Sequence, residues 1–199
     1  DGARARRVAL LLCDGRGDDA HLPYRGNVSS LVALKQALYI REQQHDATVY
    51  VLYKDMQSPG QHEYFYKRVQ EDPGILFSRG DVRSVTEDGA QTLQIDVDET
   101  VVGGTIRVPV DLLVVSVDMV PATLDPPSSG TLNLRYLQGK DLPTTRFGFA
   151  DSHFLCFPYE TRRTGIYAAG AVRQAMDLAG CAQDGSGAAL KGTSGPPVG

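Results

Sequence analysis

Three short apolar runs alternate with two amphipathic segments in the first half of the chain, and this order limits the possible folds more than any other feature. The runs at 7–13, 47–53 and 75–77 are continuous and apolar, which is typical of strands buried on both faces. The segments at 31–43 and 62–71 have the residue spacing of helices. This order predicts a small parallel sheet with right-handed crossovers, as in a Rossmann-like α/β fold.

The first amphipathic segment, 31–43, places its apolar residues on one helical face. That predicted face comprises Leu31, Leu34, Ala37 and Leu38, with Arg41 at its end. Polar residues that precede the face are helix-capping types, namely Asn27, Ser29 and Ser30. The second helical segment is predicted to end at Asp72-Pro73-Gly74.

The pattern changes after the third apolar run. Short strand-like stretches occupy 82–85, 92–97 and 105–110, with turn residues at 88–89 and 103–104 between them. They predict a three-stranded antiparallel meander that covers one face of the sheet. A further apolar stretch at 111–117 predicts one more strand.

Proline, serine and glycine at 126–130 mark the expected domain boundary. The chain is therefore divided into a first domain at 1–121, a linker at 122–148, a C-terminal segment at 149–191 and a disordered tail at 192–199. The absence of an initiator methionine suggests a piece of a longer polypeptide.

Charge and composition exclude several classes of partner. The net charge of −4 gives no basis for binding nucleic acid or an anionic membrane. No apolar run reaches about 18 residues, so direct membrane insertion is not expected. Cys13, Cys156 and Cys181 lie far apart in the sequence, which favours buried thiols in a reducing cytoplasm over a redox pair or a metal site.

A strand-like run at 164–170 ends in small residues and a glycine, and the helix-forming stretch 172–178 follows it. Small residues let another group approach the backbone closely, and the N–H groups of a helix N-terminus attract an anion or a polar ring edge. The run resembles the second flavin-contacting motif of the pyridine nucleotide-disulfide oxidoreductase class. In that class an aspartate follows the glycine and holds the ribityl chain, whereas this chain has Ala171.

The resemblance implies FAD as the cofactor of the intact protein. It places backbone contacts at Gly170, Ala171 and Val172, and a positive charge at Arg173 beside the reduced ring. The stretch 184–190 resembles the helix start that packs against the flavin ring in the class; close helix–sheet packing is the alternative. No catalytic residue is identified.

Closer likenesses narrow the class. The stretches 34–38, 51–56 and 63–66 resemble the A subunit of heterodisulfide reductase, an FAD-dependent oxidoreductase. The stretches 149–154 and 159–167 resemble the B subunit of the quinone-interacting membrane-bound oxidoreductase complex. The resemblance makes 1–121 a second nucleotide-binding domain and 149–191 the return segment of a flavin domain.

Departures from these relatives limit what the chain can bind. The A subunit of heterodisulfide reductase carries cluster-binding cysteines, of which only Cys13 matches; Arg25, Ser29 and Ser30 stand at the later positions. An iron–sulfur cluster needs several thiolates, so no cluster is expected. The loop 14–19 has two glycines and three acidic residues, which favours a structural loop over a nucleotide site or a protein-docking loop.

Two functions remain open. The first is a module of an FAD-dependent electron-transfer oxidoreductase in sulfur or energy metabolism, with other redox subunits as partners. Its expected location is cytoplasmic, or at a membrane through those subunits. The second is a non-catalytic scaffold with a degenerate nucleotide site. FAD binding by this chain alone is not expected, because no strand, glycine-rich loop and helix for the adenosine half are present.

Overall fold

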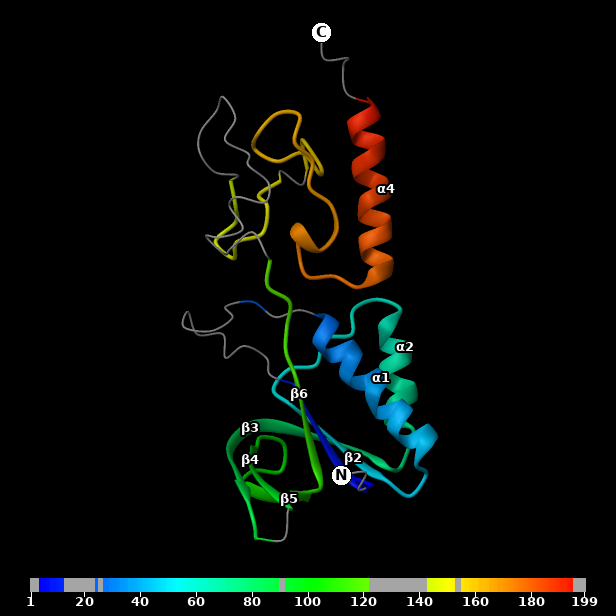
Figure 1. The fold of residues 1–199 in the computed structure, drawn as a ribbon, viewed down its shortest axis with the longest axis vertical. Helices are drawn as coiled ribbons and strands as arrows, with labels where there is room; N and C mark the ends of the chain where they lie inside the picture. The colour runs from blue at the N-terminus through cyan, green and yellow to red at the C-terminus, as the bar shows by residue number, and fades with distance from the viewer. Residues whose placement is uncertain are drawn as a thin grey trace. The chain divides into compact units, whose positions relative to one another are not determined.

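The computed structural model describes residues 4–12, 24, 27–89, 92–121, 143–152 and 155–194. The chain forms two compact units, Asp1–Asp118 and Met119–Gly199. The first unit holds one sheet with two helices, and the second holds a series of turns and one long helix (Figure 1).

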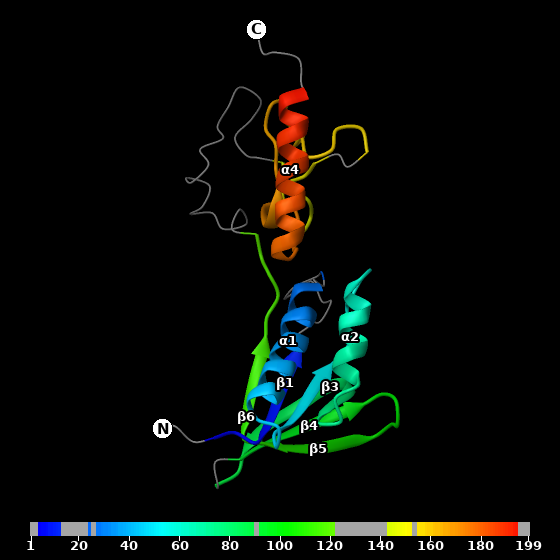
Figure 2. The ribbon, with the colours of Figure 1, turned by 90° about the vertical axis from the view of Figure 1, so that its right-hand side faces the viewer.

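The first unit is built on a six-stranded sheet in the order β5-β4-β3-β2-β1-β6. Its strands are β1 (Arg7–Leu12), β2 (Thr48–Tyr53), β3 (Ile75–Glu87), β4 (Leu93–Glu99), β5 (Thr105–Val110) and β6 (Leu112–Ser116). β1 runs parallel to β2 and β6, and β2 runs parallel to β3, whereas β4 is antiparallel to both of its neighbours (Figure 2). The predicted Rossmann-like parallel sheet with an antiparallel meander is therefore confirmed.

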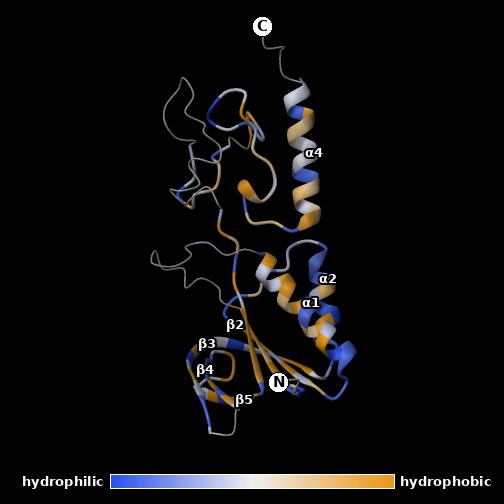
Figure 3. Ribbon diagram, in the orientation of Figure 1, coloured by the Kyte–Doolittle hydropathy of each residue, from blue (hydrophilic) through white to orange (hydrophobic). Residues whose placement is uncertain are grey.

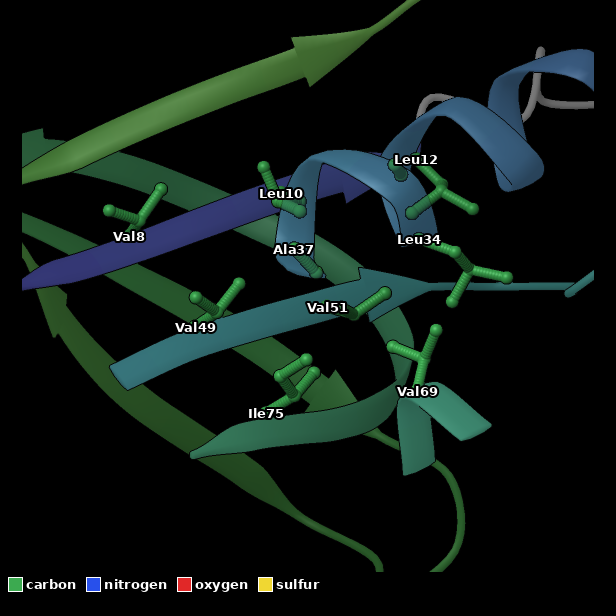
Figure 4. Close-up of a cluster of buried hydrophobic side chains, with 10 residues drawn as sticks. Val8, Leu10, Leu12, Leu34, Ala37, Val49, Val51, Val69 and Ile75 are labelled. Carbon is green, nitrogen blue, oxygen red and sulfur yellow. The ribbon is translucent and has the colours of Figure 1, made fainter. Parts of the chain in front are cut away.

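Burial on both faces explains why β1 and β2 are continuously apolar. On one face, Val8 and Leu10 of β1 lie beside Val49 and Val51 of β2 under the helices α1 (Asn27–Gln43) and α2 (His62–Gln70) (Figure 4). On the other face, Ala9 belongs to a second apolar cluster. That cluster also contains Leu52 of β2 and the buried side chains of the meander, Ile95, Val97, Val108 and Val110. Successive strand residues point to opposite faces, so both clusters need an unbroken apolar run.

The strand predicted at 75–77 and the meander strand predicted at 82–85 are one element. β3 pairs in parallel with β2 through Ile75 to Arg79 and then antiparallel with β4 from Gly80 onward. Gly80 permits this because a Cβ there would lie 2.3 Å from the carbonyl oxygen of Asp98. The glycine among polar neighbours, which resembles a turn, is instead a point of close strand contact.

The helix α1 begins earlier than predicted, at Asn27. Ser29 and Ser30 therefore lie inside its first turn and are buried, so their predicted role as caps is wrong. The Ser30 hydroxyl accepts a hydrogen bond from the backbone N–H of Gln57 (3.2 Å), and the Ser116 hydroxyl donates to the Ser29 carbonyl (3.2 Å). Tertiary partners of the first turn, which sequence spacing does not reveal, decide where these serines lie.

The sheet-facing side of α1 differs by one position from the prediction. Ala33, Leu34 and Ala37 are fully buried, whereas Leu31 is half-buried. α1 carries both hydrophobic and hydrophilic residues along its length (Figure 3). The register of the helix on the sheet therefore selects Ala33 over Leu31.

Arg41 is a structural clamp at the end of that face. Its Nε donates to the Asp72 carboxylate (3.0 Å) and its Nη1 donates to the carbonyl of Ala47 (2.6 Å). Asp72 also accepts the N–H of Gly74 (2.8 Å) in the turn before β3. The guanidinium group thus joins the end of α1, the start of β2 and the α2–β3 turn, and its side chain is only 15% exposed.

Asp111 ties the start of β1 to the turn between β5 and β6. Its carboxylate accepts the backbone N–H groups of Arg6 and Arg7 (2.9 Å each) and pairs with the Arg7 guanidinium (2.6 Å). Hydrogen bonds from the Arg7 guanidinium, and then from these N–H groups, hold the pKa of Asp111 below its ordinary value against the opposing effect of burial.

We predict that Asp111→Asn lowers the free energy of unfolding by about 1–2 kcal/mol at neutral pH, because charge-assisted hydrogen bonds at a part-exposed site are lost. The folded-state pKa lies below the unfolded value of about 3.9, so the stabilisation is present above that pH and is lost as the pH falls through the folded pKa. Urea unfolding between neutral and acidic pH measures both effects. Asp46→Asn is the control, because Asp46 makes only longer pairs with Arg4 and Arg6 (3.6 and 3.7 Å); an equal loss in both variants would contradict the assignment.

We predict that Gly80→Ala destabilises the first unit by about 1–3 kcal/mol, because the new methyl group would meet the backbone of β4. The matched control is Gly89→Ala in the β3–β4 turn, where an added Cβ meets nothing within 4 Å. Its effect on stability should stay within about 0.5 kcal/mol. Thermal unfolding of both variants makes the comparison, and similar midpoints would show that β3 does not need a glycine at its bend.

Candidate functional site

The second unit forms turns and isolated bridges where a strand is predicted. Within 164–170, Tyr167 makes a single antiparallel bridge with Glu160, and the N–H of Thr161 bonds to the carbonyl of Ile166 (2.8 Å). The prediction of a β-run is therefore wrong. Gly165 and Gly170 both have positive φ (83° and 71°), and these left-handed conformations prevent a continuous strand.

The helix after this run also begins later than predicted. A three-residue 3₁₀ turn, η3 (Gly170–Val172), comes first, and α4 spans Leu178–Ser194. Asp177 caps α4, since its carboxylate accepts the backbone N–H of Gly180 (2.6 Å). The predicted helical stretch 172–178 thus mostly precedes α4, and 184–190 lies within the helix and not at its start. The helix also includes 192–194, the first residues of the predicted tail.

Gly170 sits at the tightest point of the candidate site. It is buried with φ 71°, and an added Cβ would lie 3.6 Å from the Sγ of Cys181 on α4. Its N–H donates to the carboxylate of Asp184 (2.8 Å). The carbonyl of Val172 accepts the N–H of Ala150 (3.1 Å), so both ends of η3 are fixed to other parts of the second unit.

Arg173 follows the turn and is held by the same carboxylate. Its Nε donates to Asp184 Oδ2 (2.9 Å), and its Nη2 donates to Oδ1. The guanidinium carbon also lies 5.0 Å from the centre of the Tyr159 ring, a cation–π distance. Tyr159 itself has φ 68°, a backbone conformation that is uncommon outside glycine.

Electrostatics at this cluster favour two charged partners. The burial of Asp184 is the largest effect and would raise its pKa, but hydrogen bonds from Arg173 and Gly170, together with the positive charge of Arg173, outweigh it and lower the pKa. The hydrogen bond to Asp184 raises the pKa of Arg173. The pair therefore stays ionised, and the positive charge of Arg173 is balanced inside the unit.

The predicted site residues Gly170, Ala171, Val172 and Arg173 are contiguous on η3 and its C-terminal cap. Asp184, on which this turn depends, is missing from the sequence-based site. The only signal in the sequence is an acidic residue in a glycine-rich stretch, and the spacing of 14 residues to Gly170 carries no helical or strand periodicity.

The turn fits a flavin in one respect and departs from it in another. Ala171 is small, and no hydrogen bond among the described residues engages it, so its backbone can meet a polar ring edge. The Gly170 N–H and the Arg173 guanidinium are already engaged by Asp184. The backbone contacts predicted from the resemblance are thus compatible with the turn, whereas a free positive charge at Arg173 is not.

A hollow of about 400 Å³ lies elsewhere in the second unit, lined by Phe157, Glu160, Thr161, Arg162 and Thr164. In the first unit a second hollow, of about 350 Å³, lies where β2 and the parallel part of β3 end. Its charged residues pair with one another, Lys54 with Asp81 (2.8 Å) and Arg79 with Asp55 (3.4 Å). Neither hollow includes a residue of the predicted site.

Metal-binding side chains do not converge in the described part of the chain. Within it, no group of three or more histidine, cysteine, aspartate or glutamate residues is placed to hold a metal ion. Cys156 is exposed and Cys181 is half-buried, and the two thiols are not joined in a disulfide. Cys13 and Arg25 lie outside the described residues, so the expectation that the chain holds no iron–sulfur cluster stays a prediction.

No helix in the described ranges combines the length and apolar character needed to cross a membrane. No family model matches the sequence.

Curated relatives confirm the resemblance to the A subunit of heterodisulfide reductase. The chain is 31% identical over 194 residues to the A subunit of the H2:CoB-CoM heterodisulfide, ferredoxin reductase of Methanothermobacter thermautotrophicus. It is 30% identical over 194 residues to the second of the iron-sulfur A subunits of CoB–CoM heterodisulfide reductase in Methanopyrus kandleri. Each alignment covers 96% of this chain but only 28% of the relative, so the chain spans little more than a quarter of their length.

Solved structures agree on the fold. Thioredoxin reductase from T. acidophilum matches with a TM-score of 0.56 and 16% identity over 94% of this chain and 52% of that protein. Thioredoxin reductase from Lactococcus lactis matches with a TM-score of 0.59 and 17% identity over 96% and 52%. These identities support a shared fold alone.

We predict that Gly170→Ala destabilises the second unit by about 1–2 kcal/mol, because alanine is strained in the left-handed conformation although its Cβ has room. The control is Gly185→Ala inside α4, where an added Cβ meets nothing within 4 Å. Alanine there should stabilise the helix by up to about 1 kcal/mol. Opposite shifts in the unfolding midpoint of the second unit are expected, and a neutral Gly170→Ala would contradict the assigned conformation.

Proposed function

We propose that the chain is a module of a flavin-dependent electron-transfer oxidoreductase related to the A subunit of heterodisulfide reductase. The observation that carries this proposal is the 31% identity to a reductase subunit over almost the whole chain. The thioredoxin-reductase-like fold is consistent with it. Since the chain spans only 28% of such relatives, the rest of a redox site would come from other parts of the polypeptide or from partner subunits.

FAD is the proposed cofactor of the intact protein, and it would supply the electron-carrying ring. The backbone of Ala171 and Val172 would meet the ring edge, with Gly170 providing the left-handed turn that presents them. Arg173 would fix the end of the turn. Because no acidic residue follows Gly170, the ribityl chain would need another partner.

Other redox subunits are the proposed partners, because the relatives are named as subunits of larger reductases. We place the protein in the cytoplasm, with any membrane association arising through those subunits. Nucleic acid is not a proposed partner, given the net charge of −4.

A non-catalytic scaffold is the second candidate. The observation that favours it is the internal use of Arg173 and of the Gly170 N–H by Asp184, which leaves fewer groups for a cofactor. It predicts that the intact protein binds its partner subunits without holding flavin.

Flavin retention separates the two candidates. We expect the full-length protein, purified within its complex, to show the visible absorbance of bound flavin. Ala171→Leu in that protein should weaken FAD binding at least about tenfold, which is about 1.4 kcal/mol, because the larger side chain blocks approach to the backbone. Equilibrium dialysis with FAD gives the dissociation constants.

The control variant is Ala182→Leu, which adds the same side chain on an exposed position of α4. Equal FAD affinities for the two variants would remove η3 from the flavin site. A complex that contains every subunit, yet neither retains nor takes up flavin, would favour the scaffold.

A further inference from the structure

We propose that Asp184 is a positioning residue of the flavin-facing turn: it holds η3 through the Gly170 N–H and neutralises Arg173, so that Arg173 contributes no uncompensated charge to the site. The second half of this inference rests on the proposed flavin function. The first half concerns the second unit by itself and is testable without any cofactor.

Contacts of the Asp184 carboxylate carry the positional role. Oδ2 accepts two donors at once, the N–H of Gly170 (2.8 Å) and the Nε of Arg173 (2.9 Å). Oδ1 accepts the Nη2 of the same guanidinium, which makes the pair bidentate. One carboxylate on α4 therefore fixes both the first residue of η3 and the residue that caps it.

Burial makes these contacts specific to this pair. The Asp184 side chain is 7% exposed and the Arg173 side chain is 19% exposed, whereas the Arg162–Asp151 pair of the same unit is 64% and 26% exposed. A buried carboxylate is costly unless a charged donor satisfies it. Arg173 supplies that donor, so its guanidinium is committed to the protein interior.

The remaining surfaces of Arg173 are also occupied. Its guanidinium lies over the Tyr159 ring, and the Tyr159 hydroxyl is only 2.3 Å from where a Cβ on Gly187 would lie. Gly187 thus leaves room for the ring that covers Arg173. The fork faces Asp184 and the plane faces Tyr159, which gives the side chain a structural position instead of an open one.

The positional role is tested by hydrogen exchange of the Gly170 amide in the chain without cofactor, measured by NMR. In Asp184→Ala the carboxylate acceptor is absent, so exchange at Gly170 should accelerate at least about tenfold, as expected for a charge-assisted hydrogen bond. In Asp184→Asn, which keeps an acceptor oxygen, exchange should fall between that of the alanine variant and that of the unchanged chain.

Asp151→Ala is the matched control, because it breaks an exposed ion pair of the same unit whose carboxylate bonds to Arg162 and not to η3. Its Gly170 exchange should equal that of the unchanged chain. Amide signals of α4 show whether the unit stays folded, and where Asp184→Ala unfolds it, Asp184→Asn alone decides. Unchanged Gly170 exchange in folded Asp184 variants would overturn the positional role.

The charge role is tested by the midpoint potential of the bound flavin in the full-length protein. Arg173→Met leaves Asp184 uncompensated, so the potential should fall, since negative charge disfavours a reduced, anionic ring. Asp184→Asn leaves Arg173 uncompensated, so the potential should rise. The double variant removes both charges and should return close to the original value.

A direct role of Arg173 on the flavin gives a different pattern. The double variant would then show the same lowered potential as Arg173→Met, and that result would overturn the charge role. If the protein holds no flavin, the proposed function fails, and the hydrogen exchange of Gly170 still decides whether Asp184 positions the turn.

Discussion

Two-sided burial of the parallel strands is the constraint on which the first unit depends. β1 and β2 have no solvent-facing side, because α1 and α2 cover one face and the meander covers the other. An apolar run of this kind cannot be placed at a solvated surface without exposing half of its side chains. The long β3 makes the arrangement possible, since it continues from the parallel sheet into the meander through Gly80.

Buried or half-buried carboxylates hold the loops that this architecture requires. Asp72 joins the α2–β3 turn to Arg41, Asp111 joins the β5–β6 turn to β1, and Asp184 joins α4 to η3. Each accepts backbone N–H groups and a guanidinium at the same time. Such contacts fix the direction of a turn that apolar packing leaves undetermined, because hydrogen bonds are directional and apolar contacts are not.

The candidate site shows how this changes a functional interpretation. A motif that indicates flavin contact places an arginine beside a small-residue turn, and the sequence suggests that the charge serves the cofactor. In the structure, Arg173 and the Gly170 N–H both serve Asp184, while the backbone of Ala171 makes no hydrogen bond to the residues that the structure describes. The family resemblance is thus confirmed, while the roles of individual residues within the motif remain proposals.

The sequence determined the order of strands and helices in the first unit, because continuous apolar runs and helical spacing depend on neighbouring residues alone. It also determined the likeness to the A subunit of heterodisulfide reductase, which rests on the order of several short stretches. Only the tertiary structure decided that Gly80 joins two strands, that Ser29 and Ser30 lie inside α1, and that Asp184 neutralises Arg173. Each of these depends on atoms brought together from distant parts of the chain, and no local pattern of residues encodes such a contact.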